Sequence, residues 1–514
     1  MKRLIAVAAL CGLAWSGVAH AQIRASATID LARPGPRIAP EIYGQFAEQL
    51  GKGITEGIWV GEDSPIPNVR GYRLDVLKAV QELRVPVLRW PGGCYADTYH
   101  WRDGIGPRNQ RPITLNRWWG NNEENNAFGT HEYFDFAELI GARTFLSVNV
   151  GSGTAGEAKD WVEYVTSASR SRLAQERRAN GRDKPWTIDY AGIGNEVWGC
   201  GGNLTAEQYA PYLRVFATFV RQDQGPKTVA VGPAADDYSW TEEIMKSRDK
   251  FDVLSLHYYT LPTGDWAKKG PAVGFGKADW LKTFAQTRRL DEFLAKHSAI
   301  MDRTDPARKV AIAVDEWGTW YDTPPGAPAL WQENTLRDAL VAATNFHIFH
   351  RHAERVRMAN IAQMVNVLQA MILTDGPRMV KTPTYYAFQM YVPFQGATSL
   401  PVQVQAPELA SGAARLPAVD VTAAKGPDGA TYVGLVNIAA DEAATVQLTG
   451  GAGAAAGRIS GQVLTAPAMD SRNRFGAAEE VHPRSFAGFS RQSGGLRVAM
   501  PAKSIVVLRI DPPK

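Results

Sequence analysis

The sequence predicts a (β/α)₈ TIM barrel followed by a C-terminal β-sandwich, and three observations support this fold class. Eight short apolar runs alternate with longer amphipathic stretches between residues 38 and 390. The amphipathic stretches then stop, and short strand-like runs divided by Gly, Pro and Asp turns follow. Polar or charged residues end nearly every apolar run of the first part, as at the active-site rim of a barrel. The 514 residues suffice for one large domain and a smaller one.

The first 21 residues have the pattern of a secretory signal peptide. Lys2 and Arg3 precede an apolar run at 4–15, and Ala-His-Ala at 19–21 supplies a small-residue cleavage site. The run is too short to span a bilayer, and no later stretch reaches the roughly 20 apolar residues that spanning requires. We therefore expect a secreted or periplasmic protein without a membrane partner after cleavage of 1–21.

Two cysteines, Cys94 and Cys200, remain after the expected cleavage. Both follow predicted strands, within the glycine-rich loops 91–94 and 199–202. Because disulfides persist in the oxidising compartments that exported proteins reach, we predict a Cys94–Cys200 bridge. Two free thiols are the alternative.

The segment 22–37 precedes the barrel. Residues 23–31 alternate between apolar and polar, which is typical of a half-exposed strand, and the run ends at Pro34-Gly35-Pro36. We assign this strand to the β-sandwich rather than to the barrel.

The catalytic barrel is expected over 38–390. Its strands are predicted at 41–46, 85–90, 144–150, 187–193, 228–231, 251–256, 310–314 and 360–365. Helical patterns lie between them at 72–83, 133–140, 155–169, 206–221, 280–296 and 336–352. Thr205 and Gln208 form a capping box at the start of one of these helices.

The β-sandwich domain is expected over 391–514. Its clearest strands lie at 431–437, 444–448, 496–500 and 504–510. Together with the strand before the barrel, they make a domain that is discontinuous in sequence.

The amino-acid composition indicates which kinds of partner the protein could bind. The net charge is only +4, and Lys and Arg are scattered, so no nucleic-acid partner is expected. The 15 Trp and 17 Tyr residues provide aromatic faces that suit sugar rings as well as protein cores.

The residues that end the barrel strands gather charge at one rim. They are Glu48, Arg89, Asn149, Asn195, Glu196, His257, Tyr259, Glu316, Gln363 and Asn366. Burying such groups is costly unless they are paired or used. Paired structural ions are the alternative to an active site.

Glu196 and Glu316 are the catalytic candidates. Their separation of about 120 residues equals three strand–helix units of about 40 residues, which puts them on the fourth and seventh strands. Glycoside hydrolysis needs two facing carboxyl groups, one as acid and one as nucleophile or base. Glu196 is predicted to be the acid with a raised pKa. Glu316 is predicted to be the nucleophile, kept ionised by Arg89 or Tyr259.

A set of motifs resembles the family 51 glycoside hydrolases, chiefly α-L-arabinofuranosidases of the retaining clan of barrel glycosidases. The motifs are Phe46-Ala-Glu48, Leu88-Arg-Trp-Pro-Gly-Gly93, Trp101-Arg-Asp-Gly-Ile-Gly-Pro107, Phe128-Gly-Thr, Gly194-Asn-Glu196, His257-Tyr-Tyr259, Asp315-Glu-Trp317 and Asn360-Ile-Ala-Gln363. The resemblance implies that Glu196 is the acid/base and Glu316 the nucleophile. It also implies substrate-pocket roles for Glu48, Arg89, Asn195, His257, Tyr259 and Gln363, with Trp101 as an aromatic wall.

One position departs from the family pattern. Better-known bacterial members have Asn after Pro-Gly-Gly, in contact with a sugar hydroxyl, where this chain has Cys94. The change puts the sugar preference in question and fits a bond between Cys94 and Cys200.

The resemblance implies an exo-acting α-L-arabinofuranosidase without a cofactor, acting on arabinose-containing polysaccharides or oligosaccharides such as arabinoxylan and arabinan. A β-xylosidase or endo-β-1,4-glucanase on the same scaffold, and a non-catalytic carbohydrate-binding protein, are the alternatives. The segment 108–130 is predicted to form a rim loop that decides between a closed pocket and an open cleft. The family resemblance also suggests trimers or hexamers, with a monomer as the alternative.

A metal site was considered at His347, His350, His352 and Glu354. Only His347 and His350 share a helix face, and this helix end lies away from the predicted rim. We therefore predict helix-surface histidines and no metal.

Overall fold

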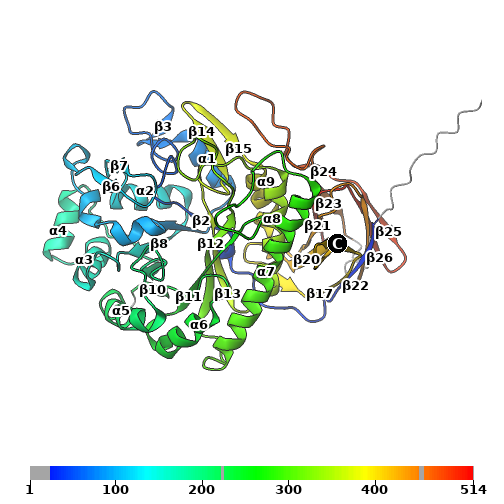
Figure 1. The fold of residues 1–514 in the computed structure, drawn as a ribbon, viewed down its shortest axis with the longest axis horizontal. Helices are drawn as coiled ribbons and strands as arrows, with labels where there is room; N and C mark the ends of the chain where they lie inside the picture. Colours follow the sequence, from blue (N-terminus) through cyan, green and yellow to red (C-terminus); the bar gives the residue numbers. More distant parts are fainter. Residues whose placement is uncertain (1–22, 222–224, 451–456, 513–514) are drawn as a thin grey trace, which may run out of the picture.

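The computed structural model describes residues 23–221, 225–450 and 457–512. A (β/α)₈ barrel lies beside a β-sandwich, so the predicted fold class is confirmed (Figure 1). The helices α3–α6 lie on the side of the barrel that is away from the sandwich, and α7 and α8 run between the two parts.

Eight parallel strands close the barrel, and each corresponds to one predicted run. They are β2 (Gly44–Phe46), β5 (Val87–Trp90), β8 (Arg143–Val148), β9 (Tyr190–Ile193), β10 (Lys227–Ala230), β11 (Val253–Thr260), β12 (Ala311–Thr319) and β13 (Val356–Ala362). The prediction for β13 began and ended too late. Residues 363–365 have already left the barrel and turn over its rim, and they include apolar residues that the pattern counted as strand.

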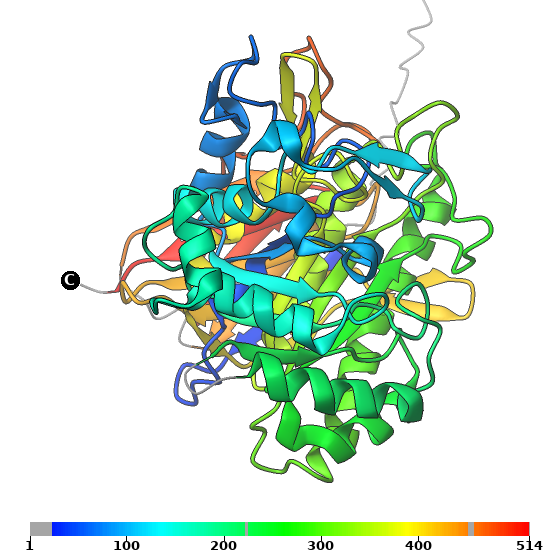
Figure 2. The same cartoon turned by 90° about the vertical axis from the view of Figure 1, so that its left-hand side faces the viewer.

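The helices cover the outside of the barrel, and Figure 2 shows several of them in front of its strands. They are α1 (Leu74–Glu82), α2 (Thr130–Ile140), α3 (Ala155–Thr166), α4 (Arg172–Ala179), α5 (Ala206–Val220), α6 (Tyr238–Ile244), α7 (Lys277–Asp302), α8 (Leu336–Arg351) and α9 (Pro383–Tyr391). The predicted capping box is present at α5: Thr205 accepts a hydrogen bond from the Gln208 amide, and the Gln208 side chain accepts one in return.

Two sheets form the sandwich. One has the order β17 (Val402–Gln405), β1 (Ile23–Ile29), β22 (Ala444–Gly450), β26 (Gly495–Met500) and β25 (Phe489–Gln492). The other has the order β16 (Thr398–Leu400), β20 (Val419–Lys425), β21 (Thr431–Asn437), β27 (Ser504–Ile510), β23 (Ile459–Leu464) and β24 (Arg484–Ser485). Short two-stranded ribbons, including β6 (Thr114–Asn116) with β7 (Asn122–Glu124), decorate the surface.

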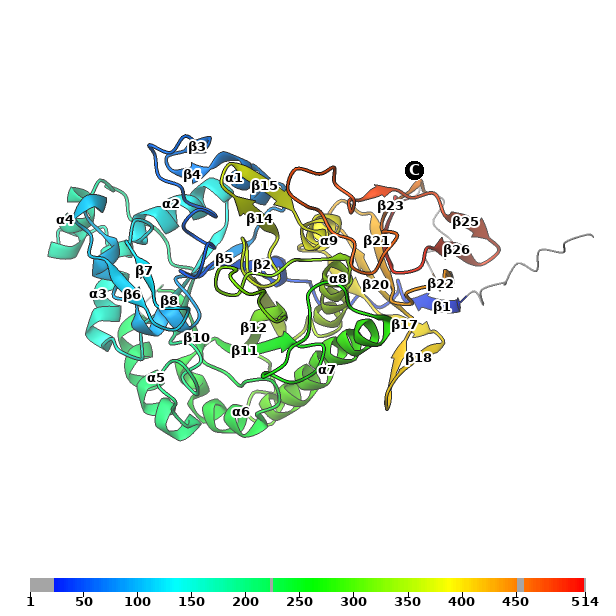
Figure 3. The same ribbon diagram turned by 45° about the horizontal axis from the view of Figure 1, so that its top comes forward.

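The first strand of the described chain belongs to this sandwich. β1 pairs in parallel with β22 and antiparallel with β17, and Figure 3 shows it beside β22, far from the barrel. Its alternate residues Ala25, Ala27 and Ile29 are buried against the second sheet. The alternation in the sequence therefore reflects one face in the core and one in solvent.

The histidines of α8 correct the sequence analysis, because His347 and His350 are buried rather than on a surface. The ring of His347 is hydrogen-bonded to the Tyr391 hydroxyl, and the ring of His350 to Tyr43 and Thr422. The reason is that the sandwich covers the side of α8 that the barrel leaves open. A helix that is covered on both sides has no solvent-exposed face, so the spacing of its apolar and polar residues does not indicate which side is buried.

None of the helices in the described ranges is both long enough and apolar enough to cross a membrane.

Candidate active site

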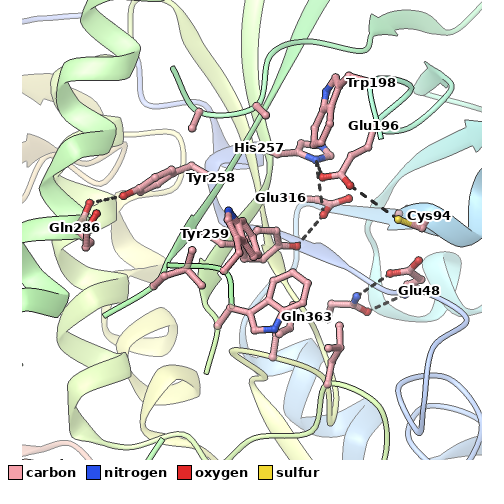
Figure 4. Close-up of a pocket in the computed structure, with 18 of the residues that line it drawn as sticks. Glu48, Cys94, Glu196, Trp198, His257, Tyr258, Tyr259, Gln286, Glu316 and Gln363 are labelled. Carbon is pink, nitrogen blue, oxygen red and sulfur yellow. Dashed lines mark hydrogen bonds and ion pairs between the residues drawn. The ribbon is translucent and has the colours of Figure 1, made fainter. Parts of the chain in front are cut away.

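A cavity of about 350 Å³ opens at the C-terminal ends of the barrel strands. Its lining includes Glu48, Cys94, Glu196, His257, Tyr259, Glu316 and Gln363, which come from six different strand ends or the loops that follow them. Figure 4 shows these side chains around one space (Figure 4). Six of the ten predicted rim residues thus line one cavity, whereas Arg89, Asn149, Asn195 and Asn366 do not.

Glu316 is held from two sides on β12. Arg89 on β5 donates a hydrogen bond from Nη1 to Oε1 of Glu316 at 2.8 Å, and the Tyr259 hydroxyl donates to Oε2 at 2.7 Å. Arg89 is buried below the cavity, and its Nη2 also donates to Asn195 Oδ1 at 2.5 Å. These donors fix the orientation of the Glu316 carboxylate.

Glu196 has a different environment. It follows β9 with φ of 40°, a left-handed backbone conformation that residues other than glycine seldom adopt and that costs about 1–3 kcal/mol. Burial raises the pKa of its carboxyl, although the His257 ring, with Nδ1 at 2.7 Å from Oε1, opposes the shift. A raised pKa favours the protonated form of the carboxyl, which is the form that a general acid needs.

His257 lies between the two carboxyl groups. On neighbouring strands, His257 of β11 pairs in register with Glu316 of β12. Burial disfavours the charged imidazole, but Glu316 and Asp315 outweigh it and raise the pKa of His257 to about 10. The ring is therefore a cation at neutral pH and donates toward the carboxylates.

The two candidate carboxyl groups are close to each other. One oxygen of Glu196, one nitrogen of His257 and one oxygen of Glu316 all lie within 4.8 Å of one another. These oxygens are therefore closer than the roughly 6.5–9.5 Å that separates the carboxyl groups of inverting glycosidases.

Glu48 forms a third acidic position in the cavity wall. Its carboxyl accepts hydrogen bonds from the Tyr95 amide, the Trp119 indole and the Gln363 side chain at 3.0–3.2 Å. Burial and the nearby Glu316 charge raise its pKa to about 8. Glu48 and Gln363 thus offer neighbouring hydrogen-bonding groups for sugar hydroxyls.

The predicted Cys94–Cys200 disulfide is present, with a Cα–Cα distance of 5.5 Å. It joins the loop after β5 to the loop after β9. The sulfur atoms of Cys94 and Cys200 lie 3.9 and 3.7 Å from Oε2 of Glu196. Bonded sulfurs carry no hydrogen, so these are packing contacts.

Three predicted pocket residues, Arg89, Trp101 and Asn195, do not line the cavity. Trp101 does not line the cavity: it is buried, stacks on Trp161 and donates its indole N–H to the backbone oxygen of Glu157. Asn195 lies behind the cavity wall, where it accepts from Arg89.

Sequence reasoning missed the residues that provide the aromatic wall, which are Trp119, Trp198, Trp266 and Trp320. Trp119 belongs to the predicted rim loop 108–130, and Trp320 follows β12 directly. Their positions in loops that follow barrel strands could have identified both as residues of the cavity wall. Asp97 was also missed. Its carboxylate accepts from the backbone N–H groups of Val150, Gly151 and Asn195, and thereby ties three strand ends together.

Known proteins match this chain along nearly its whole length. The α-L-arabinofuranosidase 1 domain family matches residues 79–270, and the α-L-arabinofuranosidase C-terminal domain family matches residues 315–504. An intracellular exo-α-L-arabinofuranosidase of Bacteroides ovatus is 46% identical over 95% of this chain and 96% of that protein. The chain belongs to the α-L-arabinofuranosidases of glycoside hydrolase family 51.

Solved structures agree with this assignment. The family 51 arabinofuranosidase of Xanthomonas axonopodis pv. citri superimposes with a TM-score of 0.93, at 50% identity over 95% of this chain and all of that one. An arabinose complex of the Thermotoga maritima α-L-arabinofuranosidase gives a TM-score of 0.84, at 30% identity over 95% of this chain and 99% of that one. This arabinofuranosidase is therefore an enzyme, and the non-catalytic alternative is wrong.

The expectation of secretion is corrected. The Bacteroides ovatus arabinofuranosidase that resembles this one is named intracellular, which points away from a secreted or periplasmic enzyme. The expectation rested on the signal-like segment 1–21, which lies outside the described residues. A basic start and an apolar run can satisfy that pattern without establishing export.

Proposed function

We propose that this enzyme removes terminal α-L-arabinofuranosyl residues from arabinose-containing plant polysaccharides or oligosaccharides, such as arabinoxylan and arabinan, with retention of configuration. Exo action is supported by the name of the Bacteroides ovatus relative. Retention is supported by one observation above all: two neighbouring carboxyl groups, Glu316 and Glu196, have opposite electrostatic environments.

In the first step, an oxygen of Glu316 attacks the anomeric carbon while Glu196 gives its proton to the departing glycosidic oxygen. The bond to the leaving group breaks, and a glycosyl–Glu316 ester forms. Arg89 and Tyr259 orient the Glu316 carboxylate for this attack.

In the second step, Glu196 accepts a proton from water, and the water oxygen attacks the anomeric carbon. The ester breaks, arabinose leaves, and both residues return to their starting states. Glu48 and Gln363 are proposed to hydrogen-bond the sugar hydroxyls. The cationic His257 donates to Glu196 and is proposed to stabilise the carboxylate that Glu196 becomes.

The assignment of roles predicts opposite products with azide. Glu316→Ala should lower kcat/KM on nitrophenyl arabinofuranoside by at least about 10⁴-fold, and azide should restore turnover with an inverted glycosyl azide as product. Glu196→Ala should hydrolyse substrates with good leaving groups and give a retained azide. NMR of the anomeric proton distinguishes the two products. A Glu316→Ala variant with wild-type turnover would contradict the mechanism.

A further inference from the structure

The disulfide wall of the cavity brings three metal-ligating side chains together. Both sulfur atoms, of Cys94 and Cys200, face the same oxygen of Glu196, at 3.9 and 3.7 Å. All three ligand atoms lie within 4.8 Å of one another. We propose that reduction of this disulfide creates a binding site for a thiophilic divalent cation such as Zn²⁺, with Glu196 as the third ligand, and that the bound metal inhibits the enzyme.

The bridged form does not offer this site, because the metal ligand is the thiolate and a bonded sulfur has no charge to give. A dithiol reductant changes that. It passes two electrons to the S–S bond, becomes a cyclic disulfide itself and leaves two Cys thiols. Binding of Zn²⁺ then releases the two thiol protons.

The distances suit a tetrahedral zinc. With Zn–S bonds of about 2.3 Å and Zn–O bonds of about 2.1 Å, sulfur and oxygen ligands stand about 3.6 Å apart. The two sulfur–oxygen distances here are already 3.7 and 3.9 Å. Only the two sulfurs must separate, which breaking their bond requires in any case.

The two oxygens of Glu196 serve different partners. Oε1 binds His257, whereas Oε2 faces the sulfurs. A cation at the sulfurs would therefore take the free side of the carboxyl group. Cys94 and Glu196 both line the cavity, so an ion enters from the same space as substrate and keeps a fourth position open toward it.

Inhibition follows from the use of Glu196, and this part of the inference rests on the proposed function. A carboxylate bound to zinc neither donates a proton to the leaving oxygen nor accepts one from water. Both halves of the reaction are blocked, while Glu316 and its donors stay in place.

The test compares oxidised and reduced enzyme without any substitution. The full chain is treated with dithiothreitol, desalted under argon and titrated with Zn²⁺, with a chromogenic zinc indicator and an arabinofuranoside assay read in parallel. We expect one equivalent of zinc bound and at least tenfold loss of turnover in the reduced enzyme, with recovery on adding EDTA. The oxidised enzyme should bind no zinc and keep its activity.

Variants separate the ligands. Cys94→Ser and Cys200→Ser, each treated with reductant, should bind zinc at least tenfold more weakly than the reduced wild type, as should reduced Glu196→Gln. Cys11→Ser, the matched control, should bind like the wild type. Equal inhibition of oxidised and reduced enzyme would overturn the proposal, because the zinc would then bind elsewhere, for instance at Glu196, His257 and Glu316. Absence of zinc binding after reduction would overturn it too. Binding that leaves hydrolysis intact would contradict the role given to Glu196 and not the metal site.

Discussion

Two charge clusters in this molecule, one buried and the other partly exposed, have opposite character. The rim cluster contains four acidic side chains, Glu48, Glu196, Asp315 and Glu316, with two basic ones, Arg89 and His257. The interface cluster, between barrel and sandwich, contains Asp291 and Asp420 with Arg288 and Arg351. Acid exceeds base in the first cluster, and the two balance in the second.

The imbalance has visible consequences. In the interface cluster, burial works against the Asp420 carboxylate, but Arg351, His347 and Arg288 outweigh it and hold its pKa far below the ordinary value. In the rim cluster, the pKa of Glu196 is raised and that of Glu48 reaches about 8. A buried charge alone therefore does not mark an active site. A surplus of carboxyl groups around a cavity, with too few cations to ionise them all, is more informative.

Among variants that keep both catalytic carboxyl groups, the largest effect is expected from Arg89→Gln in the rim cluster. The variant loses a charged donor to Glu316 and leaves the acidic groups with fewer cations. We expect kcat/KM to fall by about 10²–10³-fold, the scale of losing one donor at a developing charge. Steady-state kinetics measures this. A loss smaller than tenfold would mean that Tyr259 alone orients Glu316.

Asp420→Asn, in the interface cluster, should lower stability and leave activity nearly unchanged. It removes the acid that Arg288 and Arg351 share. Because both arginines are partly exposed, we expect a loss of about 1–3 kcal/mol of unfolding free energy, less than for a fully buried ion pair. Urea unfolding measures that loss. The kcat of the folded variant should stay within about twofold of wild type, because the cluster is not part of the cavity lining. A large fall in kcat would mean that the two clusters are coupled.

Glu48→Gln tests the excess of acidic groups in the rim cluster through the pH dependence of the unfolding free energy. In the folded enzyme Glu48 keeps its proton up to about pH 8, whereas its ordinary pKa is 4.5. The unfolded chain therefore binds fewer protons between these values, and Glu48 lowers stability increasingly as pH rises through this window. The variant lacks this term, so its unfolding free energy relative to wild type should increase by up to a few kcal/mol from pH 5 to pH 8. Parallel stability curves would contradict the raised pKa.

The smallest effect is expected from Gly93→Ala. A Cβ at this position would lie 2.8 Å from Oε2 and 2.9 Å from Oε1 of Glu48, closer than real Cβ contacts, so the carboxyl group must move. We expect KM to rise several-fold with little change in kcat, because Glu48 is proposed to bind the sugar and not to react with it. Gly156→Ala in α3 is the matched control, since nothing tighter than 3.7 Å meets its Cβ. Equal kinetics for the two variants would remove Glu48 from the binding site.

The sequence was most informative for functional residues whose position depends on a single strand of the barrel. Glu196 and Glu316 follow barrel strands, and strand ends of a closed parallel barrel meet at one rim, so their meeting was predictable. The fold class was predictable from the alternation of strands and helices. The disulfide prediction used the position of both cysteines after barrel strands, but its other premise, export, is contradicted by the name of the Bacteroides ovatus relative.

The failures arose where two distant segments decide the outcome. His347 and His350 are buried because β20 and β21 cover α8, and nothing within the helix signals that contact. Trp101 and Trp119 are both aromatic and both follow β5, yet only Trp119 reaches the cavity. Loop conformation decides between such residues, and neither hydrophobic pattern nor spacing predicts it.

The position of β1 affects how the chain is completed during synthesis. This strand leaves the ribosome first among the described elements, but its antiparallel partner β17 follows after roughly 370 more residues and β22 later still. At about 5–20 residues per second, tens of seconds pass before either partner exists. During that interval the apolar residues of β1 remain without their native neighbours while the barrel strands assemble. This sheet of the sandwich therefore forms only after residue 450 has been synthesised, when β22 is available to pair with β1.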